Sequence, residues 1–399
     1  MNNLRNINVK GRKVLVRCDF NSVPVSPDNP GSDFKIKKVI PTLTHLREGG
    51  AKIIVISHLG RPKNREQELS MRPVAKRLWE LLGGNVKFVN DTIGKGVEKE
   101  INAMKEGDMV VLENLRFYKE EKENDEKFAR ELAKLADIFV QDGFGVCHRV
   151  QASVVGIPKF IPSYPGLLLE EEIRVLSDVL VNPEKPLVSI IGGAKILTKT
   201  RVIERLTDKS DYVLLGGKIA NSILVAKGIC IKDLMSNEEE DLREVAKGIN
   251  LTSPKLHLPI DGVMALSNFE EEYSRVGAVG TVRREEGIYD VGPETIEKFK
   301  LILSEAKTII WNGPLGFFEK KPFDKGTNEI AKMIGQINSQ VFSVVGGGET
   351  VEAIQNLKIE NQFDFISTGG GAMLDFIAGK DLPGIVALEE NSKKKNDED

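Results

Sequence analysis

Short apolar runs alternate along this chain with longer segments in which apolar residues recur at helical spacing. Residues 39–47 and 71–84 have helical patterns, Ser70 is the expected N-cap of the second, and a third helix is expected to begin at Asp125. The intervening apolar runs are predicted to be strands: 13–20, 53–57, 86–89, 109–112 and 138–140. Short apolar strands separated by helices indicate a parallel sheet that is covered on both faces.

This alternation pauses once, in a segment with three prolines between residues 158 and 165. The helical pattern LLLEEEIRVLSDVLVN follows and ends near Pro183 and Pro186. Prolines on both sides of one amphipathic helix favour a connector between two domains. The alternation then resumes over 187–378, whereas the charged end of segment 382–399 is expected to be disordered.

The predicted strands of the two halves end in different chemistry. In the first half they end in polar and charged groups: VLVRCDFN, IIVISHLGR, MVVLENLRF and DIFVQDGFG. In the second half they end in glycine clusters that are each expected to lead into a helix: Gly192–Gly193, Gly216–Gly217, Gly313 with Gly316, Gly346–Gly348 and Gly369–Gly371. A single cluster is ordinary turn chemistry, but five at the ligand-binding edge of one sheet favour phosphate binding by backbone N–H groups.

Composition narrows the class of protein. A chain of 399 residues with 41% hydrophobic and 29% charged residues is expected to form two cores. Its net charge of -3 argues against a nucleic-acid binder. Three scattered cysteines fit neither a disulfide framework nor a zinc site, and no apolar run approaches the length of a membrane span or signal peptide. A soluble cytoplasmic protein is expected.

Several side chains in the second half add chemistry to the glycine turns. Lys195 and Lys199 are four residues apart, so on a helix they would share one face at its start, although exposed lysines have the same pattern. Asn312 and Glu319 flank a Gly-Pro-Leu-Gly turn. Glu349 follows three glycines, where it would hold a metal-bound phosphate or simply favour the helix N-terminus. No glycine cluster matches a P-loop or a dinucleotide fingerprint.

In the first half, basic side chains follow three predicted strands: His58 with Arg61, Arg116, and His148 with Arg149. Each alone would be an ordinary surface charge, but at one sheet edge they would repel one another unless an anion joined them. No Ser-His-Asp order, metal-binding His pair or CxxC is present, so nucleophilic and zinc catalysis fit poorly. Of the other side chains, Trp79, Trp311 and Cys147 are expected to be buried in the core.

From about residue 5 to 388 the chain resembles the phosphoglycerate kinase family. The matching strings are RCDFN, SHLGRP, RPVAKRL, VLENLRFYKEE, GGAK, WNGPLGFFE, VVGGGET, ISTGGGA and LPG. The resemblance implies an α/β fold of two Rossmann-like domains with mainly parallel sheets. Residues 1–165 would bind 3-phosphoglycerate, 166–185 would form the connecting helix and hinge, 186–379 would bind nucleotide, and 380–399 would return to the N-terminal domain. The implied reaction is reversible, Mg²⁺-dependent phosphoryl transfer between 1,3-bisphosphoglycerate and ADP, giving 3-phosphoglycerate and ATP.

The family's functional residues carry over position by position. The implied substrate-binding residues are Asp19, Phe20, Asn21, Lys35, His58, Leu59, Gly60, Arg61, Arg116 and Arg149. The implied nucleotide-binding residues are Gly193, Ala194, Lys195, Lys199, Gly217, Asn312, Gly316, Glu319, Gly347, Gly348, Glu349 and Thr350. Lys35, Lys199 and Gly347 would be catalytic, and Glu349 would bind the metal. The family's usual state is a monomer, with no nucleic-acid or membrane partner.

The sequence also departs from the family pattern. Lys35 stands where the family usually has Arg, and a lysine lacks the planar fork of a guanidinium. The other departures are Ser22 as an insertion, Gln151 for His, Lys218 for Gly, Glu349 for Asp and Phe365 for His. They leave open a catalytically weak paralogue that binds nucleotide. A nicotinamide dehydrogenase is a third alternative, but this sequence lacks the glycine fingerprint and the ribose-binding acid of such enzymes.

Overall fold

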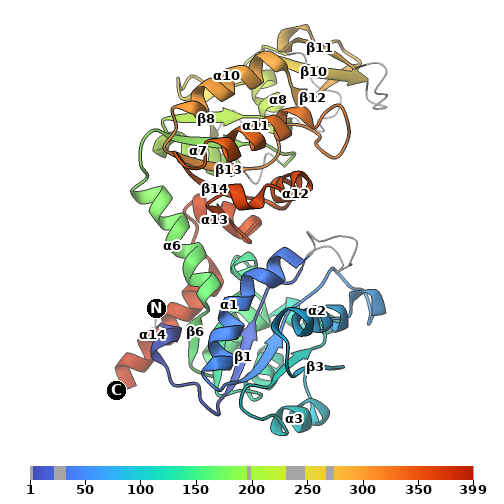
Figure 1. Cartoon of the computed structure of the whole chain (residues 1–399), viewed down its shortest axis with the longest axis vertical. Coiled ribbons are helices and arrows are strands. Elements are labelled where there is room, and N and C mark those ends of the chain that lie inside the picture. The colour runs from blue at the N-terminus through green and yellow to red at the C-terminus, as the bar shows by residue number, and fades with distance from the viewer. Residues whose placement is uncertain (1–2, 22–32, 196–198, 231–247, 267–273, 399) are drawn as a thin grey trace. The chain divides into compact units, whose positions relative to one another are not determined.

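The computed structural model describes residues 3–21, 33–195, 199–230, 248–266 and 274–398, with side chains as far as residue 393. The chain divides into two compact units. Unit 1 comprises Met1–Arg174 with Asp381–Asp399, and unit 2 comprises Val175–Lys380. Each unit is an α/β structure built on a six-stranded sheet, so the predicted fold class is confirmed (Figure 1).

The sheet of unit 1 has the order β3-β4-β2-β1-β5-β6, and all its strand pairs are parallel. Its strands are β1 (Lys13–Arg17), β2 (Lys52–Ile56), β3 (Val86–Val89), β4 (Met109–Leu112), β5 (Ile138–Gln141) and β6 (Ser163–Pro165). The bounds of β3 and β4 are as predicted, and those of β1, β2 and β5 differ from the predicted bounds by at most three residues. The three-residue strand β6, inside the proline-containing segment, was not predicted.

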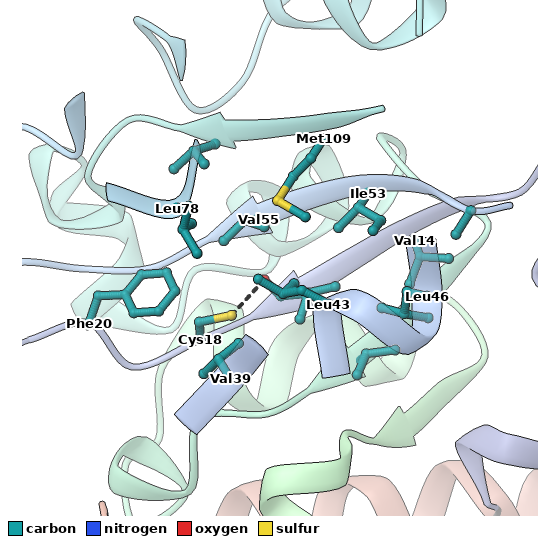
Figure 2. Close-up of a cluster of buried hydrophobic side chains, with 14 of the residues drawn as sticks. Val14, Cys18, Phe20, Val39, Leu43, Leu46, Ile53, Val55, Leu78 and Met109 are labelled. Carbon is teal, nitrogen blue, oxygen red and sulfur yellow. Dashed lines mark hydrogen bonds between the residues drawn. The ribbon is translucent and has the colours of Figure 1, made fainter. Parts of the chain in front are cut away.

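Helices cover both faces of this sheet, because successive strand residues point to opposite sides. The α-helices between the first five strands of unit 1 are α1 (Phe34–Glu48), α2 (Arg72–Leu82), α3 (Lys95–Asn102), α4 (Lys119–Glu123) and α5 (Glu126–Ala133). On one face, Val39 and Leu43 of α1 and Leu78 of α2 pack against Val14 and Val55 (Figure 2). On the other face, residues of α3 and α5 pack against Leu15 and Ile54: Val97, Ile101, Phe128 and Leu132.

Local predictions in unit 1 had mixed outcomes. Asp125 is the N-cap of α5, and its carboxylate accepts a hydrogen bond from the N–H of Phe128 at 2.8 Å, as predicted. The N-cap position of α2 is Met71 rather than Ser70, although the Ser70 hydroxyl accepts from the N–H of Arg72 at 3.2 Å. Trp79 is 52% exposed, so its predicted place in the core is wrong.

Unit 2 contains a second parallel sheet, with the order β15-β14-β13-β7-β8-β9. Its strands are β7 (Leu187–Ile191), β8 (Tyr212–Leu215), β9 (Leu256–His257), β13 (Thr308–Asn312), β14 (Phe342–Gly346) and β15 (Phe365–Ile366). Its helices are α7 (Thr200–Lys209), α8 (Gly217–Ala226), α10 (Pro293–Ser304), α11 (Lys325–Gln336), α12 (Gly348–Leu357) and α13 (Gly371–Ile377). Trp311 is fully buried in the central strand β13, as predicted.

A separate antiparallel sheet in unit 2 was not predicted. It has the order β11-β10-β12, from β10 (Asp261–Leu266), β11 (Arg275–Ala278) and β12 (Glu286–Val291). The aromatic rings of Tyr289 in β12 and Phe323 lie 5.2 Å apart and pack with Val263 and Ala265. This small core fixes the position of β12, which matters for the site in unit 2.

Two helices carry the chain into and out of unit 1. Helix α6 (Leu167–Val181) forms where the connector was predicted, and its first turn is held by Asp142, whose carboxylate accepts from the N–H groups of Leu168 and Leu169. Helix α14 (Pro383–Glu398) belongs to unit 1, where Asn391 donates to the carbonyl of Pro158. The charged end that was predicted to be disordered is therefore helical to Glu398.

Among the helices that the structure describes, none is long and apolar enough to span a membrane.

Candidate functional site

The carboxyl ends of four parallel strands in unit 1 bring most of the predicted substrate residues to one edge of the sheet. Arg17 ends β1 and is followed by Asp19, and His58 follows β2. Arg116 follows β4, and Arg149 follows β5. Phe20 is buried beneath this edge in the core and donates its N–H to the hydroxyl of Ser57 at 3.0 Å.

One buried amide connects the loops after β2 and β4. The side chain of Asn114 donates to the carbonyl of Leu59 at 2.8 Å and accepts from the N–H groups of Leu59 and Arg116 at 3.2 and 3.0 Å. Asn21 accepts from the N–H of Gly60 at 2.9 Å, and Arg116 donates to the Gly60 carbonyl at 2.5 Å. These bonds fix the backbone of the His-Leu-Gly-Arg turn. Sequence reasoning did not single out Asn114, although it lies in the ENLRF string.

Lys35 lies in the first turn of α1 and forms an ion pair with Asp19. Its Nζ is 2.6 Å from Oδ2 of Asp19 and 3.4 Å from the carbonyl oxygen of Asn21. Burial opposes ionisation of Asp19, but the electrostatic interactions with Lys35, His58 and Arg17, together with the hydrogen bond from Lys35, outweigh burial and lower the pKa of that carboxyl well below its usual value. Asp19 is thus a carboxylate at neutral pH, able to accept a hydrogen bond from a ligand hydroxyl.

The remaining cations of this edge carry an excess of positive charge. Among the residues described, no carboxylate forms an ion pair with Arg61, Arg116 or Arg149. Burial, followed by the charges of Arg149 and Arg17, lowers the pKa of Arg116 to about 10. Mutual repulsion of this kind is relieved when an anion binds among the guanidinium groups. The edge therefore has the electrostatics of an anion site.

Arg17 is a component of this edge to which the sequence analysis assigned no role. Its side chain is fully buried, which is rare for an arginine, and it lies beside His58. A basic residue at the last position of an otherwise apolar buried strand was the available signal.

The site in unit 2 is a cavity of about 290 Å³. It is lined by Gly193, Ala194, Gly217, Lys218, Ile288, Tyr289, Pro314, Gly316, Phe317, Glu319 and Glu349. Six of these eleven were predicted as nucleotide-binding. Ile288, Tyr289, Pro314 and Phe317 were not predicted, and the first two belong to β12, whose sheet the apolar pattern did not show. They supply an apolar wall opposite the glycine turns.

The structure corrects the predicted arrangement of the two lysines near this cavity. Helix α7 begins at Thr200, and Lys199 is its N-cap residue, so Lys195 and Lys199 do not share a helix face. Lys199 is 7% exposed, and its Nζ donates to the carbonyl oxygen of Gly192 at 2.7 Å and to that of Asn312 at 3.4 Å. Burial lowers the pKa of Lys199 to about 8, against the opposing charge of Glu349. Lys195 is exposed.

Gly193, which lines the cavity, and Gly347, two residues before the lining residue Glu349, have conformations that other residues rarely adopt. Gly193 has φ +90° and Gly347, the N-cap of α12, has φ +92°. A Cβ on Gly193 would lie 3.2 Å from Nζ of Lys199 and 3.7 Å from Oε2 of Glu349, so all three groups meet at one point. Behind them, the hydroxyl of Thr350 accepts from the N–H of Gly313 at 2.8 Å, which joins two glycine turns.

The glycine clusters do not all precede helices as predicted. Gly216, Gly347 and Gly370 are the N-caps of α8, α12 and α13. The turn of Gly313 and Gly316 instead continues to a helix that begins only at Lys325. This turn lies at the cavity without a helix N-terminus of its own.

Glu349 and Glu319 give the cavity an acidic side. Glu349 is exposed in the first turn of α12, and burial together with the charge of Glu349 raises the pKa of Glu319. No three His, Cys, Asp or Glu side chains within the described ranges gather as a preformed metal site. Mg²⁺ in nucleotide enzymes commonly takes one or two carboxylates and otherwise phosphate oxygens and water, so a lone carboxylate beside Gly193 fits it.

The departures from the family pattern have different surroundings. Lys218 is exposed at the start of α8 and lines the cavity. Phe365 is buried in β15, and Gln151 is buried ahead of the helical turn at residues 152–156. Ser22 lies outside the described residues.

Comparison with known proteins gives a consistent result. The family model for phosphoglycerate kinase matches residues 4–380. The chain is 44% identical over 389 residues to the phosphoglycerate kinase of Dictyoglomus turgidum, covering 97% of this chain and 98% of the relative. It is 43% identical over 393 residues to that of Aquifex aeolicus, covering 97% and 98%. The solved structure of phosphoglycerate kinase from Coxiella burnetii aligns with a TM-score of 0.81 at 36% identity, covering 98% of this chain and 99% of that one.

Proposed function

Since the chain belongs to the phosphoglycerate kinase family, and is thus a glycolytic phosphotransferase, we propose which of its residues bind the two substrates and carry the transfer. Unit 1 binds 3-phosphoglycerate or 1,3-bisphosphoglycerate, and unit 2 binds ATP or ADP. The observation that carries this division is the pair of complementary sites. Among the residues described, Arg61, Arg116 and Arg149 of unit 1 have no carboxylate partner, and unit 2 has a glycine-lined cavity beside the buried Lys199.

In unit 1, Arg61, Arg116 and Arg149 bind the phosphate that stays on the triose. Their unneutralised charge suits a dianion, and a guanidinium can bind it with two parallel hydrogen bonds. Asp19, held as a carboxylate by Lys35, accepts a hydrogen bond from the triose hydroxyl. Asn114 and Asn21 accept hydrogen bonds from the backbone N–H groups of Leu59 and Gly60, which holds this turn in place beside these groups.

In unit 2, the apolar wall of Ile288, Tyr289 and Phe317 receives the nucleotide base and ribose. The backbone at Gly193 and Gly217, and the start of α12 at Gly347 and Gly348, bind phosphate oxygens through N–H groups. Lys195, Asn312 and Thr350 complete this set, Thr350 by holding the Gly313 turn. Glu319 lies at the same cavity as Glu349.

The chemistry needs no general base, because the acceptor is already a carboxylate. One oxygen of the 3-phosphoglycerate carboxylate attacks the γ-phosphorus of ATP, the new O–P bond forms, the β–γ bridging bond breaks, and ADP leaves with that electron pair. Lys35, Lys199 and the N–H of Gly347 act by stabilising charge on the transferring phosphoryl group. Glu349 holds Mg²⁺, which supplies charge neutralisation of the nucleotide phosphates.

We further propose that the enzyme acts in the cytoplasm as a monomer, with small-molecule substrates and neither nucleic acid nor membrane as a partner. The chain's net charge of -3 supports the exclusion of nucleic acid. Residues 166–185 serve as the connecting helix and hinge between the 3-phosphoglycerate domain, 1–165 with 380–399, and the nucleotide domain, 186–379.

The test is a coupled assay of ADP formation with MgATP and 3-phosphoglycerate. We expect turnover that a chelator abolishes and Mg²⁺ restores. Glycerate, which lacks the fixed phosphate, is the matched control substrate and should have a far lower kcat/KM. Equal kcat/KM for the two acceptors would refute the role of the three arginines, and absence of turnover with Mg²⁺ present would favour the catalytically weak paralogue.

A further inference from the structure

A buried chain of polar side chains lies behind the anion site of unit 1. The carboxylate of Glu121, in α4, accepts from the hydroxyl of Ser153 at 2.6 Å and from its N–H at 2.9 Å. The same hydroxyl accepts from Nε of Arg17 at 2.8 Å. Nη2 of Arg17 then lies 3.1 Å from Nδ1 of His58. All four side chains are 1% exposed or less.

The last bond of this chain determines the tautomer of His58. A guanidinium has N–H donors and no acceptor, so Nδ1 of His58 must be the acceptor and must carry a lone pair. The proton of the neutral imidazole therefore lies on Nε2. Nε2 is buried and has no hydrogen-bond partner among the residues described, which leaves one N–H available to a ligand.

The charges around His58 keep the ring neutral. Burial lowers the pKa of His58 well below its usual value, and the charges of Arg17, Arg116 and Arg149 lower it further, against the single opposing charge of Asp19. Arg17 itself is fully buried, and Glu121 is the largest of the charges that offset its burial. Without Glu121, Arg17 would be a buried cation opposed chiefly by Asp19, which Lys35 already pairs.

We propose that Glu121 and Ser153 are positioning residues that hold Arg17 against Nδ1 of His58, so that His58 presents a neutral Nε2–H to the anionic triose. This inference rests on the proposed binding of 3-phosphoglycerate in unit 1. Neither Glu121 nor Ser153 contacts a ligand in this arrangement. They act by fixing the donor of one hydrogen bond and by keeping that donor from changing its charge near neutral pH.

The first measurement needs no variant and no substrate. The chain has four histidines, so long-range ¹H–¹⁵N correlation spectra of the ¹⁵N-labelled protein are simple, and His58→Gln identifies the His58 signals. We expect the shifts of a neutral Nε2–H ring that do not titrate between pH 5.5 and 8. An Nδ1–H tautomer, or a ring that protonates in this range, would overturn the proposal even if the enzyme is fully active.

The second measurement compares three variants. Glu121→Gln keeps the shape of the side chain and removes the charge, Ser153→Ala removes the link, and Glu126→Gln is the control, because Glu126 is an exposed carboxylate paired only with Arg130 among the residues described. We expect the first two to shift His58 towards mixed tautomers and to raise KM for 3-phosphoglycerate by ~10-fold, the worth of one hydrogen bond to a charged group. KM for MgATP should stay unchanged in all three.

Spectra decide between positioning and general stability. A variant that loses affinity for 3-phosphoglycerate with the wild-type His58 spectrum would refute the relay through Arg17, and so would unchanged affinity with a changed spectrum. If a variant does not fold, the wild-type spectrum remains the deciding measurement. Failure of the proposed function would appear separately, as absence of turnover in the wild-type protein.

Discussion

Replacing Lys35 by alanine tests the least usual residue of the proposed catalytic set. Lys35 has three N–H donors. One is directed to Asp19 at 2.6 Å and one to the carbonyl of Asn21 at 3.4 Å. Within the described part of the chain the third donor has no partner, which makes it available to the transferring phosphoryl group. Lys35→Ala removes this donor and also removes the counter-ion of Asp19.

The expected magnitude follows from the exposure of this side chain. Loss of one preorganised donor to a transition-state anion costs about 10²–10³ in kcat. The side chain of Lys35 is 21% exposed, so water partly screens its charge and the lower end of that range applies. We therefore expect kcat to fall about 10²-fold, equivalent to ~2.7 kcal/mol. KM for 3-phosphoglycerate should change much less, because the arginines hold the fixed phosphate. Lys35→Arg should be tolerated or faster, because a guanidinium adds a second parallel donor.

Steady-state kinetics in both directions measures these effects. Lys37→Ala is the matched control, since Lys37 lies on the same helix, is 54% exposed and pairs with Asp33 at 3.0 Å. That variant should retain wild-type kcat. Asp19→Asn, combined with Lys35→Ala in a double-mutant cycle, separates loss of the catalytic charge from exposure of an unpaired carboxylate. Wild-type kcat in Lys35→Ala would show that the family's role had been carried onto the wrong residue.

Three further predictions concern unit 2 and the transfer step. Lys199→Ala should lower kcat by about 10²-fold with little change in ADP affinity. In the wild-type enzyme, kcat/KM for MgATP should fall as pH rises through about 8, because Lys199 loses its proton there. Lys199→Arg should move this fall to higher pH, and an unchanged pH profile in that variant would contradict the role of Lys199. Gly193→Ala should abolish nucleotide binding, measured by calorimetry. Gly228→Ala is the control and should leave nucleotide binding intact, because Gly228 also has a positive φ, +69°, but has nothing within 4 Å of an added Cβ. Equal losses of nucleotide affinity in the two variants would mean that backbone strain alone is responsible. Because the substrates are proposed to bind to separate units and would have to meet for transfer, solution scattering should give the smallest radius of gyration with both bound. An equally small radius with either substrate alone would count against hinge closure.

Features carried by local patterns were predictable. The period of apolar residues located β3 and β4 to the residue, and a side chain that caps its own helix, such as Asp125, needs only its neighbours three positions away. The different chemistry at the strand ends of the two halves was visible for the same reason, since each strand end is contiguous in sequence. Which roles these residues play came from the family resemblance and stays a proposal.

Features that depend on distant partners were not predictable. Lys199 was placed on a helix face, but the chain begins α7 one residue later, and the lysine turns to carbonyl groups of two other strand ends. Ile288 and Tyr289 of the cavity's apolar wall come from β12, whose strand pairing required β10 and β11 to be in place. Trp79 has the apolar surface of a core residue, yet no element covers it sufficiently.

The sequence alone therefore determined the α/β class, the succession of strands and helices, and the chemical character of each strand end, because these depend on residues close together in the chain. Tertiary structure decided which charges are buried and which remain for a ligand. Arg17 and Ser153 are 136 positions apart, and their hydrogen bond exists only because the sheet brings the end of β1 to the segment after β5. Burial, ion pairing and the tautomer of His58 all follow from such long-range contacts, since desolvation and charge act through space and not along the chain.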